Sequence, residues 1–181
     1  RATKSGLARD TQLKMNQKYD SDVASQCLAY IRDMINANLG TGESPVDLDT
    51  NGSMENMHAV LKDGVYLARF GNALIPGSIA QKKYAKPPTM AFKCMELIGL
   101  FLEVATKYEI PDQERFQTVD LYENQNMNQV TVCIQSIGRK ALANGQMGFG
   151  PKESAANPRN FDEETLRAGQ NVIGLQAGTN K

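Results

Sequence analysis

Residues 61–77 read LKDGVYLARFGNALIPG and form the segment around which we expect the fold to be organised. Between Val65 and Leu74 the apolar residues recur at the spacing of a helix with one broad apolar face. Asp63 stands where a first-turn carboxylate would meet the positive end of the helix dipole, and Pro76 would end the helix. Because an isolated helix this short is only marginally stable, we expect other helices to pack around it.

The flanking sequence predicts three long helices for this role. Residues 21–39 and 127–143 carry apolar side chains at helical spacing. Residues 90–107 are apolar around most of the helix circumference, which predicts the most buried helix of a bundle. Ser21 is the expected N-cap of the first long helix, and Gly40 is its expected end.

Shorter elements connect these helices. A short helix is expected within residues 10–18, with Leu13 and Met15 as its anchors. No stretch alternates with a period of two for long enough to predict a strand, so the expectation is an all-α bundle from about 21 to 143. The remaining short segments are helical turns at 54–61 and 116–122, a loop at 41–53 and an extended basic loop at 76–88.

Composition excludes several classes of protein. The chain has 181 residues, with 20 basic and 20 acidic side chains that cancel. A general nucleic-acid binder would usually be basic overall, so we expect no nucleic-acid partner. No apolar run approaches 18 residues, so no membrane span is expected, and the N-terminus lacks the apolar core of a secretory signal.

Three cysteines, Cys27, Cys94 and Cys133, lie within apolar helical patterns. Their number is odd, and there is no CxxC or Cys/His pair, which argues against a disulfide framework or a zinc site. We expect reduced, buried thiols in an intracellular protein.

Charge is segregated along the chain. Residues 1–18 are basic, residues 103–123 are acidic, and a second basic group comprises Lys82, Lys83, Lys86 and Lys93. Such runs are either solvated faces or surfaces that meet an oppositely charged partner.

Residues 47–58, DLDTNGSMENMH, are the one candidate metal loop. Oxygen ligands fall at loop positions 1, 3, 5, 7 and 9 and glycine at position 6, as in an EF-hand. His58, the only histidine, replaces the bidentate glutamate at position 12, and imidazole is a poor ligand for Ca²⁺. The alternatives are a polar loop rich in turn formers and a Ca²⁺-regulated module. No nucleophile motif accompanies His58 and no phosphate loop is present, so we expect no enzymatic activity and no cofactor.

Several motifs together resemble one family. Residues 61–65 (LKDGV) and 74–78 (LIPGS) resemble the signature of a calponin-homology (CH) domain. Residues 88–96 (PTMAFKCME) and 116–123 (FQTVDLYE) look like the transgelin branch, and residues 172–181 (VIGLQAGTNK) resemble the opening of a calponin-like repeat. The chain is therefore similar to the calponin/transgelin family over nearly its whole length.

The resemblance implies a compact all-α CH domain of four main helices plus short ones, with a flexible C-terminal tail. Family members usually carry Trp where Tyr30 stands, and a buried tyrosine hydroxyl needs a partner or water. The implied organisation is a basic extension at 1–20, a CH domain at 21–144, a linker at 145–166 and a partial calponin-like repeat at 167–181.

The family binds filamentous actin, often bundles it, and is not enzymatic. The resemblance thus implies a cytoplasmic protein of the cytoskeleton or of muscle with filamentous actin as its partner. Because a single CH domain is not reliably sufficient in this family, we expect the tail to carry the contact, with electrostatic support from Lys152 and Arg167. The expected contact residues are Ile173, Gly174, Leu175, Gln176, Gly178, Thr179, Asn180 and Lys181.

A second reading is a signalling adaptor whose CH domain docks a partner other than actin. Such an adaptor would work without the tail, whereas a filament binder of the first kind would not.

Overall fold

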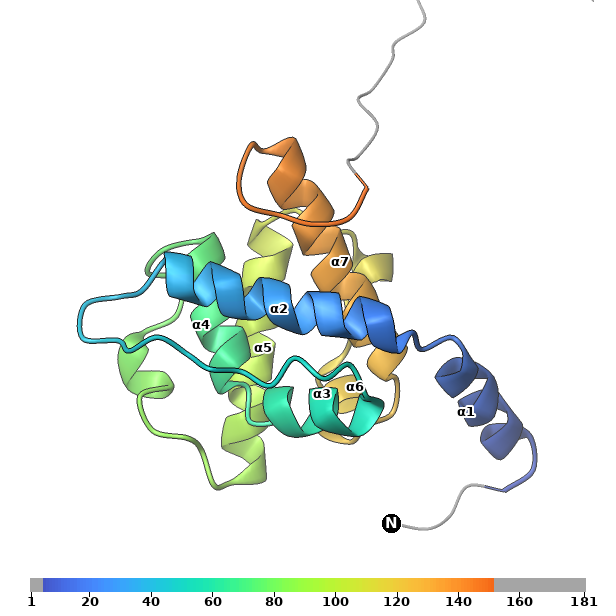
Figure 1. Ribbon diagram of the computed structural model, residues 1–181. Coiled ribbons are helices and arrows are strands. Elements are labelled where there is room, and N and C mark those ends of the chain that lie inside the picture. The colour runs from blue at the N-terminus through green and yellow to red at the C-terminus, as the bar shows by residue number, and fades with distance from the viewer. Residues whose placement is uncertain (1–4, 152–181) are drawn as a thin grey trace, which may run out of the picture.

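The computed structural model describes residues 5–151, and this part of the chain folds into helices without strands, which confirms the all-α prediction (Figure 1). The helices are α1 (Leu7–Gln17), α2 (Ser21–Ala37), α3 (Met54–Leu61), α4 (Val65–Leu74), α5 (Ala91–Lys107), α6 (Thr118–Tyr122) and α7 (Met127–Ala143), with 3-10 turns η1 (Gln81–Lys83) and η2 (Asp112–Glu114). No helix in residues 5–151 has both the length and the apolar character needed to cross a membrane.

Helix α4 lies in the centre of the bundle, between α2 and α5 (Figure 1). Its Phe70 ring meets Tyr30 of α2 edge-on at 5.5 Å and stacks on Phe101 of α5 at 5.9 Å. Phe101 in turn stacks on Phe116, just before α6, at 6.2 Å. This row of rings joins four segments of the chain, so the expected central role of residues 61–77 is confirmed.

The start of α4 differs in detail from the expectation. Asp63 precedes the helix, and its carboxylate accepts a hydrogen bond from the Val65 N–H at 2.9 Å. Gly64 is the N-cap and adopts a left-handed conformation with φ 77°. A Cβ at Gly64 would lie only 2.7 Å from Leu97 Cβ of α5, so glycine serves both the turn and the close approach of two helices.

The expected N-cap of α2 was wrong by one residue. Asp20 is extended, and its carboxylate accepts from the N–H groups of Asp22 and Val23 at 2.9 and 3.2 Å. Ser21 is already the first helical residue, so its hydroxyl is not in the capping position. The helix ends at Ala37, before Gly40.

The expected burial of residues 90–107 was only partly right. Cys94, Leu97 and Phe101 of α5 are buried, but Phe92 is 61% exposed and Met90, just before the helix, is 53% exposed. Among the described helices α7 has more buried residues than α5. An apolar pattern around the whole helix does not reveal which side lacks a neighbour.

Two smaller elements also depart from expectation. Leu13 of α1 is half exposed and does not anchor that helix, whereas Met15 is partly buried. Gln12 instead holds α1 in place by donating to the Gln125 carbonyl at 2.7 Å. The basic loop at 76–88 is not fully extended, because it contains η1 and buries Tyr84.

Candidate functional site

The eight tail residues expected to contact actin lie outside the residues that the structure describes, as do Lys152 and Arg167. Within residues 5–151 the features that bear on function are a polar junction around Glu43, an exposed basic and apolar surface at the start of α5, and the segment that follows α7.

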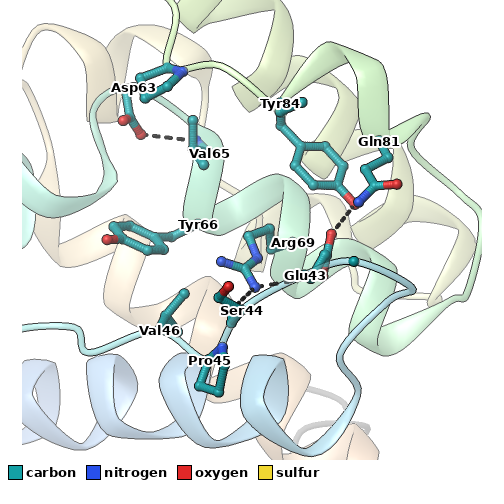
Figure 2. Close-up of a pocket in the computed structure, with 13 residues that line it drawn as sticks. Glu43, Ser44, Pro45, Val46, Asp63, Val65, Tyr66, Arg69, Gln81 and Tyr84 are labelled. Atoms are coloured by element: carbon teal, nitrogen blue, oxygen red, sulfur yellow. Dashed lines mark hydrogen bonds and ion pairs between the residues drawn. The ribbon is translucent and has the colours of Figure 1, made fainter.

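The polar junction joins three separate segments (Figure 2). The Glu43 carboxylate accepts from the Tyr84 hydroxyl at 2.8 Å and lies 3.6 Å from Arg69 Nη2. The same Arg69 nitrogen donates to the Ser44 carbonyl at 2.7 Å. Asn72 of α4 donates to the Tyr84 oxygen at 2.8 Å. These contacts fasten the loop before α3 and the segment around η1 to one side of α4.

A hollow of about 400 Å³ lies beside this junction, and its walls include Pro45, Tyr66 and Asp63 (Figure 2). Burial raises the pKa of the Asp63 carboxyl, although the Val65 N–H opposes the shift. Burial and the bond to Glu43 also raise the pKa of Tyr84, which keeps its hydroxyl protonated as a donor. Because Glu43 and Arg69 already bond to each other and to loop atoms, the junction supports the fold rather than a reaction.

In the candidate metal loop, residues 47–58, side chains accept hydrogen bonds from backbone N–H groups of the same loop. Asp49 accepts from the Asn51 N–H, and Asn51 accepts from the Ser53 N–H, both at 2.9 Å. His58 Nε2 lies 3.2 Å from the Tyr122 carbonyl oxygen, which joins α3 to α6. Within residues 5–151 no three His, Cys, Asp or Glu side chains gather as metal ligands would.

The second feature is an exposed surface at the N-terminal end of α5. Lys82, Lys83, Lys86 and Lys93, here called the basic cluster, are all exposed. Lys83 pairs with Glu96 of α5 at 2.7 Å. Since Glu96 follows Phe92 by four residues, the exposed Phe92 ring lies on the helix face that Lys83 approaches. The sequence pattern identified the lysines but not the exposure of Phe92.

The chain after α7 folds back onto the bundle. The Tyr30 hydroxyl donates to the Met147 carbonyl at 3.0 Å, and the Tyr30 ring lies 5.0 Å from Phe149. Burial raises the pKa of Tyr30. The partner that its hydroxyl required is thus a backbone carbonyl in the first part of the expected linker. In the sequence, the signal of this contact is a lone aromatic residue in a Gly-rich stretch, which does not by itself predict a contact with α2.

All three cysteines are free and buried, as expected. Burial raises the pKa of both Cys27 and Cys133 to about 12. Their thiols therefore stay protonated near neutral pH, and neither is an activated nucleophile.

The calponin homology (CH) domain family matches residues 23–143. The chain belongs to the calponin homology (CH) domain family. It is also 37% identical to myophilin from Echinococcus granulosus over 180 residues, which cover 98% of this chain and 87% of myophilin. The resemblance to the calponin/transgelin family is thereby confirmed.

Two solved structures of Vav1 share the CH fold. Autoinhibited Vav1 matches with a TM-score of 0.54 and 22% identity over 70% of this chain. Vav1 inhibited by an allosteric inhibitor matches with a TM-score of 0.55 and 25% identity over 75% of this chain. In both cases the match covers 24% of the Vav1 chain, so the likeness concerns one part of a longer protein.

Proposed function

We propose that this CH protein is a non-enzymatic component of the cytoskeleton that binds actin filaments through its C-terminal tail. The observation that supports the proposal most is the likeness to myophilin along 98% of the chain, which includes the tail as well as the CH domain. The tail resembles the opening of a calponin-like repeat, the element to which the family's filament contact is often attributed.

The CH domain has the role of a stable carrier in this proposal. Most polar groups of its junction are used internally, since Glu43 bonds to Tyr84 and pairs with Arg69, which also donates to the Ser44 carbonyl. The buried Arg69 Nε is the exception and has no hydrogen-bond partner among the described residues. A short segment such as 173–181 can become ordered on a partner, with Ile173 and Leu175 in apolar contact and Lys181 near acidic groups.

Co-sedimentation of the full chain with actin filaments tests the proposal. The double substitution Ile173→Ser/Leu175→Ser should reduce pelleting strongly, because it removes both apolar contacts. Leu166→Ser is the matched control, since it makes the same change in the same tail but outside the expected contact. If the double variant and the control pellet equally with the wild type, the tail does not carry the contact.

A signalling adaptor is the second candidate, and the Vav1 structures favour it. In Vav1, a protein with GEF activity, the matching fold is only part of a longer chain. For this chain the adaptor surface would be the basic cluster with Phe92. Binding of a partner other than actin that survives Ile173→Ser/Leu175→Ser but is lost in Phe92→Ser would support the adaptor.

A further inference from the structure

Helix α5 carries an apolar stripe that the described part of the chain leaves partly uncovered. Phe92 is 61% exposed, and Met95, Gly99 and Leu102 are only partly buried. A Cβ at Gly99 would meet no atom within 4 Å. Because these residues follow one another at intervals of three or four, they lie along one side of the helix. We call Phe92, Met95, Gly99 and Leu102 the outer stripe.

A hollow lies at one end of the outer stripe. It has a volume of about 390 Å³ and is lined by Leu102, Phe116 and Arg115 among others. The Arg115 Nη atoms bond to Asp112 and Thr106, but its buried Nε has no hydrogen-bond partner. Leu102 and Phe116 give the hollow an apolar side, whereas Asp112, Arg115, Gln117 and Thr118 line the rest of it, and the Arg115 guanidinium is already paired with Asp112.

The described chain ends close to this hollow. A Cβ at Gly150 would lie 3.7 Å from Arg139 Cγ of α7, and Arg139 Nη2 lies 3.1 Å from Glu114 of η2. Glu114 directly precedes Arg115. Residues 152–160 can span at most about 30 Å, which is sufficient to bring residue 161 to the hollow.

The sequence beyond residue 160 matches the outer stripe in pattern and length. In a helix, Phe161, Thr165, Ala168 and Val172 would share one side, since they are spaced by four, three and four residues. The helical distance from Phe161 to Val172 is about 16 Å, and that from Leu102 to Phe92 is about 15 Å.

We propose that residues 161–172 dock as a helix along the outer stripe, antiparallel to α5. Phe161 enters the hollow on its apolar side, against Leu102 and Phe116, and Val172 covers Phe92. Glu96, which pairs with Lys83, and Glu103 flank the stripe. Residues 173–181 stay outside the docked segment, so the docking can be tested in the absence of actin filaments.

Methionine methyl groups provide a direct test in the full chain. The chain has eight methionines. Met95 lies in the outer stripe, whereas Met34, Met57 and Met127 are buried elsewhere and serve as internal references. In ¹³C-methyl NMR spectra, Phe161→Ser/Val172→Ser should move the Met95 resonance and leave the three references unchanged. Leu166→Ser, which alters the tail off the docking side, should leave Met95 where it is in the wild type.

Three results would overturn the proposal. An identical Met95 resonance in the wild type and in Phe161→Ser/Val172→Ser would mean that the segment does not cover the stripe. A Met95 resonance that depends on protein concentration would mean that a second copy occupies it. A shift that extends to Met34 and Met127 would mean that the substitutions change the core instead.

Discussion

At the scale of single residues, Gly64 shows how the sequence motif LKDG creates the centre of the fold. Its φ of 77° favours glycine, and its Cα faces Leu97 and Ile98 of α5 across a short gap. A side chain at this position would both strain the backbone and push two helices apart. The glycine is thus needed for helix packing as well as for the turn.

Gly64→Ala should therefore lower the free energy of unfolding by about 2–4 kcal/mol, since backbone strain adds to overpacking. Gly77→Ala is the matched control, because Gly77 has a φ of 76° but open space around its Cβ position. It should cost only about 1 kcal/mol. Urea denaturation measures both values, and equal losses would show that the contact with Leu97 is unimportant.

The buried thiols make a prediction about pH. Unfolded cysteines ionise near their ordinary pKa of 9.0, whereas burial raises the pKa of Cys27 and Cys133 to about 12. Between these values the unfolded state binds fewer protons than the folded state, so stability falls as pH rises. The contribution of each buried neutral thiol to the free energy of unfolding is fully present below pH 9. Above pH 9, each thiol lowers that free energy by up to about 1.4 kcal/mol per pH unit.

Cys27→Ala should therefore give a shallower decline of unfolding free energy between pH 9 and pH 11, even if the variant is less stable at pH 7. Tyr19, whose pKa burial raises to about 12, contributes in the same direction above pH 10 in both proteins. Parallel declines in the wild type and in Cys27→Ala would contradict the account of the buried thiol.

At the scale of helices, the N-cap of α2 is Asp20 in the structure, whereas the sequence pattern predicted Ser21. Asp20→Ala removes two hydrogen bonds to the first turn and should cost about 1 kcal/mol. Ser21→Ala should change stability by less than about 0.5 kcal/mol, because Ser21 is already inside the helix. Thermal or urea denaturation measures both, and the reverse order would make Ser21 the cap.

Most helices could be predicted from sequence because their apolar periodicity is strong. The expected segments at 54–61, 65–74 and 127–143 match α3, α4 and α7. The expectations that failed, such as the burial of residues 90–107, depend on which elements pack against each other in the folded chain. Whether Phe92 is covered depends on which elements pack beside the start of α5, and no local pattern contains that information.

In the candidate site, too, some features can be predicted from local sequence and others depend on tertiary contacts. The basic cluster was recognisable from charge alone, since four lysines lie within twelve residues of one another. The junction of Glu43, Arg69 and Tyr84 was not, because these residues are far apart in sequence and meet only when two loops close on α4. The role of Phe149 depends in the same way on the return of the chain over α2.

At the scale of the whole molecule, a stable CH bundle carries a tail that is expected to make the contact. Docking of residues 161–172 on α5 would direct residues 173–181 toward the N-terminal end of that helix, where the basic cluster lies. The tail and the lysines would then form one composite surface for an acidic partner. Contacts of this kind weaken as salt is added, because exposed charges are screened.

The measurement that tests the central claim most directly is actin co-sedimentation of the full chain and of a chain lacking residues 173–181, paired with their melting temperatures. We predict that the deletion abolishes most pelleting while the melting temperature hardly changes, since in the proposed function residues 173–181 contact the filament and not the bundle. Pelleting that is unaffected by the deletion, or absent from the full chain at low salt, would contradict the account.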